Sequence, residues 1–507
     1  MAEPLAVIEI GSTGLRLLVA KVEQDKSRTL LDSSGFPVNL GKDVYTTGSI
    51  SRDTLLHILQ ILTRFTEQLV GWGITPEQTM VIGTNALREA NNRDPVVDRI
   101  KIKTGYTVKI VDGIEENRLM YLAVNDCLST ESYSVRYSDS IILEVAGAST
   151  EVMLIEKGKM AAAHSLRLGT VIIEQQLPFN QWNLDDARRY VKEFIQNTKG
   201  SLNNELNLQK IKQFIAVGND MKLAALFAGR NISKFLWEIN RDDFEKFVED
   251  IQHWTVEECI DKFKLSYSEA QTFHISLLIY LLFVKLTNVQ KIIVPETSLR
   301  DGLIISKSAS SDYLEEEFNS QIIASANNLL RKYKGDEKHA ECVKNLSLQI
   351  FDSMKNELMM GSDERLILET SAILHDIGMF IGAKKHNIHS KYLVENSEIF
   401  GLNREEISMI ARIVSYHKGV QELQNDAQFR ILPRQTRLTI LKLSAILRVA
   451  DALDRSHEQK FKNINFSVTE NSFSIKCKNR ETSLEKIALK EKGDLFENVF
   501  GYKIVLN

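Results

Sequence analysis

Apolar residues in the first three hundred positions follow either the short runs of β-strands or the three-to-four-residue repeat of α-helices. A Gly-Ser-Thr-Gly turn joins two short apolar runs near the start, which predicts a β-hairpin. Ser51 can cap a helix whose apolar residues recur at helical spacing as far as Phe65. Strands are predicted at residues 5–10, 15–22, 80–83 and 108–111, and a further helix from residue 114. This alternation of strands and helices predicts a central sheet covered by helices.

A second hairpin pattern starts at residue 140. Runs at 140–145 and 151–155 flank an Ala-Gly-Ala-Ser-Thr turn, and both hairpins place a glutamate just before the turn. Glu9 and Glu144 take the same position in the two copies. One interpretation is a pair of similar α/β lobes that face each other. The other is two ordinary hairpins, since Gly, Ser and Thr occur in many turns.

The pattern changes after about residue 306. A Ser-rich stretch, 306–311, leads into an acidic one, and long helical patterns then continue to about residue 457. Strand patterns return at 464–468, 473–477 and 503–506. The predicted domains are two lobes at 1–126 and 127–306, a helical domain at 312–457 and a small α+β cap at 458–507.

Composition limits the class of protein. A chain of 507 residues with 43% hydrophobic and 26% charged residues is expected to form several globular, soluble domains. The net charge of −4 provides no general attraction for nucleic acid or an anionic membrane, so neither partner is expected. The longest apolar run, 275–284, is too short to span a bilayer. No secretory signal precedes the first strand, and the four cysteines are far apart, which favours a reduced cytoplasm.

The two turns carry candidate chemistry. Backbone N–H groups of tight Gly, Ser and Thr turns can point at phosphate oxygens. The acid beside each turn can hold Mg²⁺ directly or through water. Together the turns indicate a phosphate-binding cleft with a hydrated metal ion.

Four segments in order resemble the Ppx/GppA (exopolyphosphatase/guanosine-pentaphosphatase) family. They are the turn after Glu9, the Thr-Asn-Ala-Leu-Arg segment at 84–88, the Gly-Ile-Glu-Glu segment at 113–116 and the turn after Glu144. The resemblance implies an actin-like (ribonuclease H-like) two-lobed α/β front half, followed by an all-α HD-type domain and the α+β cap. It also implies Mg²⁺-dependent hydrolysis of a terminal phosphoanhydride in inorganic polyphosphate or guanosine pentaphosphate, and a homodimer.

The resemblance assigns roles to individual residues. Glu116 matches the catalytic glutamate, which would act as the base on the attacking water. Arg88 matches the phosphate-holding arginine. Phosphate-loop positions are matched by Ser12, Thr13, Gly147, Ser149 and Thr150, and the Mg²⁺-binding acids by Glu9 and Glu144. Without the family order, a glutamate that opens a helix and an arginine after a strand are ordinary structural features.

The chain departs from the family pattern in both loops. Glutamates stand where the family has aspartates, and Ala146 and Ala148 stand where it has glycines. Mg²⁺ tolerates little distortion of its octahedron, so the longer acids indicate either a compensated or a weakened site. Alanine avoids positive φ, so a reshaped phosphate loop is expected.

Six of the ten histidines lie in the back half. His339, His375 and His417 each continue an apolar helical stripe, which predicts that they face inward. The order of histidines and aspartates resembles HD-domain phosphohydrolases. That resemblance assigns a first metal, Mn²⁺, Fe²⁺ or Zn²⁺, to His339, His375, Asp376 and Asp451, and a second to His417 with His386 or His389. The alternative is that these histidines only form hydrogen bonds in a core.

Three hypotheses remain open from the sequence. The first is phosphoanhydride hydrolysis in the front cleft. The second is a front-half phosphate or nucleotide sensor, with hydrolysis by the HD-type domain or only metal binding there. The third is a binding or scaffold protein in which both sites are relics. The sequence does not choose between polyphosphate and guanosine pentaphosphate.

Overall fold

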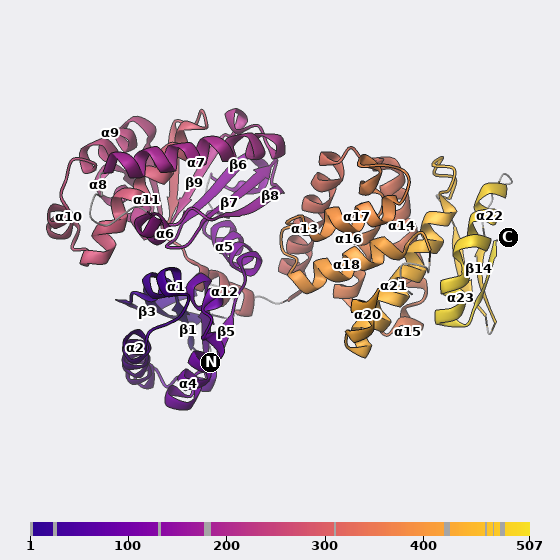
Figure 1. Cartoon of the computed structure of the whole chain (residues 1–507), viewed down its shortest axis with the longest axis horizontal. Coiled ribbons are helices and arrows are strands. Elements are labelled where there is room, and N and C mark those ends of the chain that lie inside the picture. Colours follow the sequence, from indigo (N-terminus) through magenta and orange to yellow (C-terminus); the bar gives the residue numbers. More distant parts are fainter. Residues whose placement is uncertain are drawn as a thin grey trace. The chain divides into compact units, whose positions relative to one another are not determined.

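The computed structural model describes residues 4–23, 28–129, 133–176, 184–308, 311–419, 426–461, 464–469, 471–476 and 482–506. The chain forms two compact units (Figure 1). The front unit is Met1–Glu315 and the back unit is Glu316–Asn507. The division falls inside helix α13, Ser311–Lys332, close to the predicted Ser-rich boundary. Positions 309 and 310 of that boundary lie outside the described residues.

The first lobe of the front unit is built on a five-stranded sheet of order β3-β2-β1-β4-β5. Its strands are β1 Pro4–Ile10, β2 Gly14–Val22, β3 Arg28–Pro37, β4 Thr79–Gly83 and β5 Val108–Ile110. Its helices are α1 Leu40–Thr47, α2 Arg52–Val70, α3 Asn85–Glu89, α4 Arg93–Thr104 and α5 Gly113–Leu128. The Ser51 side chain caps α2 as predicted, and Phe65 is fully buried in the core beneath the sheet.

The second lobe is built on a seven-stranded sheet of order β10-β11-β12-β9-β6-β7-β8. Its strands are β6 Ser140–Val145, β7 Thr150–Glu156, β8 Lys159–Leu166, β9 Gln213–Val217, β10 Arg230–Ser233, β11 Leu236–Asn240 and β12 Lys291–Pro295. Its helices are α6 Thr170–Gln176, α7 Leu184–Glu205, α8 Asn219–Ala228, α9 Arg241–Ile251, α10 Val256–Phe263 and α11 Tyr267–Lys285, followed by α12 Leu299–Ser308. The long apolar run lies in α11, which is buried on almost every side.

The two sheets repeat one topology. The order β3-β2-β1-β4-β5 corresponds to β8-β7-β6-β9-β12, with the same antiparallel meander beside the same parallel strands. In register, Glu9 lies opposite Arg16 and Glu144 lies opposite Glu151. The two-lobed interpretation of the hairpin repeat is therefore confirmed.

The back unit is helical until a small sheet at its end. Its helices are α14 Glu337–Ser353, α15 Lys355–Leu358, α16 Ser362–Leu374, α17 His386–Glu395, α18 Arg404–Tyr416, α20 Ala427–Ile431 and α21 Arg434–Leu453. The tail contains β13 Asn465–Val468, β14 Ser472–Lys476, α22 Ser483–Lys492, α23 Asp494–Phe500 and β15 Lys503–Leu506. The predicted tail strands are present, although Cys477 lies outside the described residues. The finer division into four domains stays a prediction.

None of the helices within the described residues combines the length and the apolar character that crossing a bilayer requires.

Candidate active site and candidate metal centre

The two predicted phosphate turns face each other across the front unit. In each turn the first N–H donates to a carbonyl three residues later, at 3.0 Å from Gly11 and 2.8 Å from Ala146. Gly147 lies directly against the first turn, because a Cβ atom there would come within 3.1 Å of Ser12 and 3.2 Å of Thr13. The sheet repeat thus brings two distant turns together, as the sequence interpretation expected.

The alanines of the second turn do not strain it. Ala146 and Ala148 are absent from the residues with positive φ, and so is Gly147 between them. The turn therefore requires no left-handed residue, and whether its shape differs from the loop of the family stays a prediction. The loop is held by α6, whose Thr170 and Val171 N–H groups donate to Ala146 and Gly147 carbonyls at 3.1 and 2.9 Å.

Glu116 and Arg88 form a direct ion pair in this region. Asp112 caps α5 and places Glu116 in its first turn, where the residue is only 9% exposed. Arg88 Nη1 lies 2.6 Å from Glu116 Oε1 and also donates to the Val111 carbonyl at 2.6 Å. Arg88 Nη2 hydrogen-bonds Asn85 Oδ1.

Burial raises the pKa of Glu116 to about 8, against the opposing effect of Arg88 and with a further contribution from Glu151 and Glu9. Burial likewise raises the pKa of Glu144 to about 8, and the charge of Glu9 adds to the effect. These mutual influences mean that four carboxylates share one region. Such a group is stabilised by a cation, and a glutamate that titrates near neutral pH suits a general base.

Glu151 organises the contact between the two lobes. Its Oε1 accepts hydrogen bonds from Ser149 Oγ at 2.6 Å and Ser165 Oγ at 2.7 Å, and its Oε2 accepts from Asn117 Nδ2 at 3.2 Å. Asn85 Nδ2 donates to Ser149 Oγ at 3.0 Å. Sequence reasoning missed Glu151, Asn85 and Asn117 as site residues. The signal for Glu151 was present, because it follows the second turn directly and pairs with Glu144 across the hairpin.

Glu9 is held by two arginines rather than standing alone. Its Oε1 is 3.6 Å from Arg16 Nη1, and its Oε2 is 3.3 Å from Arg300 Nε. Arg300 lies at the start of α12, far along the sequence, so only the fold places it here. The longer side chain of glutamate therefore has a structural use at this position.

The predicted phosphate-binding hydroxyls differ in their surroundings. Ser12 Oγ is 3.4 Å from Tyr45 Oη, and Thr13 Oγ1 accepts from Arg16 Nη2 at 3.2 Å. Thr150 is fully buried and donates to the Leu168 carbonyl at 2.6 Å. The Thr150 hydroxyl thus anchors β7 to the loop after β8 and is not directed at the turn.

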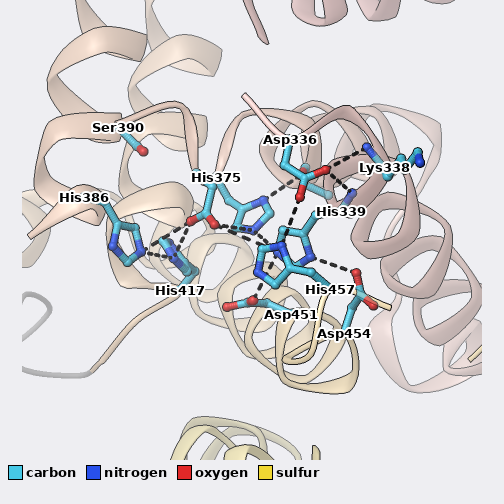
Figure 2. A network of polar contacts seen from close by, with 12 residues as sticks. Asp336, Lys338, His339, His375, His386, Ser390, His417, Asp451, Asp454 and His457 are labelled. Carbon is cyan, nitrogen blue, oxygen red and sulfur yellow. Dashed lines mark hydrogen bonds and ion pairs between the residues drawn. The ribbon is translucent and has the colours of Figure 1, made fainter. Parts of the chain in front are cut away.

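The back unit brings predicted metal ligands together from α14, α17 and α21 and from the ends of α16 and α18 (Figure 2). Ligand atoms lie within 4.8 Å of one another in two groups that share Asp376. One group contains His339, His375 and Asp376, and the other contains Asp376, His386 and His417. His389 and the predicted ligand Asp451 are in neither group, and of the two histidines of α17 it is His386 that lies beside His417.

Three hydrogen-bond acceptors converge in the second group. The Nδ1 atoms of His386 and His417 face the carbonyls of Ala383 and Val414, which can only accept, so each Nδ1 carries the proton. The two Nε2 atoms then face each other as lone pairs at 3.2 Å, and Asp376 Oδ1 is 3.3 and 3.4 Å from them.

Burial lowers the pKa of His386, which opposes relief of this crowding by protonation. Asp376 Oδ1 has no hydrogen-bond donor among the described residues. Acceptors that converge in this way are stabilised by a positive charge between them, either a proton or a metal cation. The donor set of the second group therefore fits a metal ion.

The first group is also arranged for a positive charge. His339 Nδ1 is 2.8 Å from Asp454 Oδ2, and its Nε2 is 3.2 Å from His375 Nε2 and 3.6 Å from Asp451 Oδ1. Burial alone would favour neutral His339, but the hydrogen bonds to Asp451 and Asp454 raise its pKa to about 9. Burial lowers the pKa of His375 to about 4, so this neighbour stays neutral.

A divalent ion could replace the proton that His339 attracts. Imidazole nitrogens with carboxylates suit Mn²⁺, Fe²⁺ or Zn²⁺ better than Mg²⁺. Asp454, which orients His339, was missed in the sequence. Its position three residues after Asp451 on the same helical turn was the available signal.

The fold is that of a two-lobed, actin-like α/β protein with a helical second unit. Residues 18–311 match the Ppx/GppA phosphatase family, and residues 323–497 match domain III of the Ppx/GppA phosphatases. Together these matches cover most of the chain, so the protein belongs to the Ppx/GppA phosphatase family.

Relatives of known name match over nearly the whole length. The guanosine-5′-triphosphate,3′-diphosphate pyrophosphatase of Photobacterium profundum is 23% identical over 93% of this chain and 90% of its own. The pyrophosphatase of the same name from Aliivibrio fischeri is 24% identical over 87% of this chain and 86% of its own.

Among solved structures, an exopolyphosphatase from Cytophaga hutchinsonii superposes with a TM-score of 0.55 at 19% identity, over 60% of this chain and 98% of its own. The Aquifex aeolicus family member reaches a TM-score of 0.50 at 20% identity, over 62% of this chain and all of its own. At these identities the likeness establishes the fold.

Proposed function

We propose that the front unit hydrolyses the terminal phosphoanhydride of guanosine pentaphosphate or inorganic polyphosphate, with Glu116 as the general base. The observation that carries this proposal is the pairing of buried Glu116 with half-buried Arg88 among four carboxylates, beside the two facing turns. The names of the full-length relatives support guanosine pentaphosphate as the first substrate to test.

The proposed chemistry is transfer of the terminal phosphoryl group to water. Glu116 takes the proton as the water oxygen bonds to phosphorus, and the bridging oxygen leaves with the shortened substrate. Arg88 and the amides of the two turns hold the phosphate oxygens. Glu9 and Glu144 are the proposed acids for Mg²⁺, which supplies charge neutralisation on those oxygens when bound.

The glutamates at 9 and 144 give a testable distinction between a compensated and a weakened site. Because Glu9 already reaches Arg16 and Arg300, shortening it by roughly one ångström would break those ion pairs. We therefore expect Glu9→Asp with Glu144→Asp to lower Mg²⁺-dependent phosphate release by about tenfold. The measurement is a Mg²⁺ titration of the initial rate.

Glu156→Asp is the matched control for this change, since Glu156 is exposed at the end of β7. A faster double variant would mean that the glutamates weaken the site. An unchanged Mg²⁺ dependence would mean that neither carboxylate contacts the ion, and the proposed metal role would be abandoned.

A second candidate function belongs to the back unit. There we propose a centre for Mn²⁺, Fe²⁺ or Zn²⁺ held by His339, His375, Asp376 and Asp451, with His386 and His417 at a second position. The lone pairs that converge on Asp376 favour this candidate. If that centre is the hydrolase, the front unit would serve as a phosphate or nucleotide sensor.

Cytoplasmic location and a homodimer complete the proposal. The location rests on the wide separation of the four cysteines along the sequence, a usage compatible with a reducing compartment. The homodimer rests on the family resemblance, and light scattering of the purified chain would test it.

A further inference from the structure

A lysine near the C-terminus pairs with one of the proposed metal ligands. Lys492, the last residue of α22, places Nζ against Asp451 Oδ2. Both side chains are nearly buried, at 13% and 8% exposed. The other oxygen of Asp451 lies 3.6 Å from His339 Nε2, beside the group of His339, His375 and Asp376. One oxygen of the Asp451 carboxylate therefore faces His339, and the other faces the ammonium group of Lys492.

Lys492 is held in place by a second contact on the same helix as Asp451. Arg448 lies one turn earlier on α21 and is 1% exposed. Its Nε donates to the Lys492 carbonyl at 2.9 Å, and its Nη2 pairs with Asp494 Oδ1 at the start of α23. Two successive turns of α21 thus bind the backbone and the side chain of Lys492. The ammonium group is therefore held in a fixed position beside the cluster, and it is not a charge on the open surface.

The Asp451 carboxylate is the group that both Lys492 and a metal ion would contact. Its Oδ2 accepts from the Lys492 ammonium, and its Oδ1 faces His339 Nε2 at 3.6 Å. A divalent ion on Oδ1 would share one carboxylate with the ammonium on Oδ2. Like charges a few ångströms apart in a partly buried site repel strongly.

Two effects of Lys492 on metal binding oppose each other. Orienting a metal ligand typically favours binding by about 10- to 100-fold. Repulsion between a divalent and a monovalent cation on one carboxylate exceeds that gain at effective dielectric constants of about 20. The net effect of Lys492 is therefore to weaken metal binding.

We propose that Lys492 competes with the metal ion for Asp451, so that metal binding loosens α22 from α21. This inference rests on the metal centre proposed above. It gives residues 458–507, the predicted C-terminal cap, a defined role. The cap supplies the cation that balances the charge of the metal-free cluster, and it is released when an ion arrives. The bound metal is then exchangeable, and its binding changes the packing of α22 near the C-terminus.

The test is Mn²⁺ binding to the full-length protein, measured by titration calorimetry without substrate. Lys492→Met and Lys492→Gln should bind Mn²⁺ about tenfold more tightly than the parent, or better. Lys490→Met is the matched control, because Lys490 is exposed on the same helix and carries the same charge. It should bind like the parent. Glutamine keeps a hydrogen-bond donor for Asp451, so agreement of both variants excludes a packing defect as the cause.

Amide hydrogen exchange gives the second readout. Mn²⁺ should speed exchange over residues 486–492 in the parent and leave it unchanged in Lys492→Met. Equal or weaker Mn²⁺ binding by both Lys492 variants, relative to Lys490→Met, would overturn this inference alone. If neither the parent nor any variant binds Mn²⁺, the metal centre fails and the inference falls with it.

Discussion

Glu116→Gln is expected to lower phosphate release from guanosine pentaphosphate by on the order of a hundred- to ten-thousand-fold. Glutamine keeps the size of the side chain and a hydrogen bond with Arg88, but it cannot accept the proton of the attacking water. Glu116 is nearly buried and its pKa is raised to about 8, so its carboxylate is a far stronger base than an exposed glutamate. The measurement is the initial rate of phosphate release with saturating Mg²⁺.

The neighbouring residue provides the control. Glu115→Gln makes the same chemical change one position earlier, where the carboxylate pairs with Arg118 at 3.3 Å. This variant should keep the parent rate. Thermal melting of both variants checks that the front unit stays folded. A Glu116→Gln protein with the parent rate would remove the base from the proposed mechanism.

Asp376→Ala is expected to remove transition metal from the back unit altogether. Asp376 belongs to both ligand groups, so its loss breaks both positions at once. The fall in Mn²⁺ affinity should exceed the about 10- to 100-fold that typically follows loss of a residue that only supports a ligand. In the parent, Mn²⁺ at 100 times its Kd should stabilise the folded state by about 2.7 kcal/mol per site. The variant should show no such shift in Tm.

The controls separate the two positions and the two histidines of α17. His386→Ala should lose one ion and keep the other, whereas His389→Ala should bind like the parent. Metal analysis by mass spectrometry gives the stoichiometry. Full metal content in Asp376→Ala would show that Asp376 is not a ligand. A Tm of the parent that changes with neither Mn²⁺ nor chelator would show that these histidines only form hydrogen bonds in a core.

Hydrophobic spacing predicted the strands and helices of the hairpin repeat, because buried strands and capped helices carry strong local patterns, but the choice of two lobes over two ordinary hairpins came from the family resemblance. The β1–β2 and β6–β7 hairpins and the Ser51-capped helix are examples. Strand β3 was missed because it lies at the sheet edge with many exposed positions and contains Asp, Ser and Gly, which also favour turns. The longer helices of the second lobe, such as α7, were missed as well.

The site contacts that escaped prediction come from packing between distant segments. Arg300 reaches Glu9 only because α12 returns to β1, and nothing local to either residue indicates that approach. His386 and His389 lie three positions apart on one helix, so their spacing could not decide which faces His417. Lys492 and Asp451 are likewise joined only by the packing of α22 on α21.

The most direct test compares Glu116→Gln and Asp376→Ala in one assay of phosphate release from guanosine pentaphosphate with Mg²⁺, repeated with polyphosphate. Hydrolysis in the front unit predicts that Glu116→Gln loses nearly all turnover on the true substrate and that Asp376→Ala keeps the parent rate. Loss of turnover in Asp376→Ala with full activity in Glu116→Gln would contradict it and would assign the hydrolysis to the back unit.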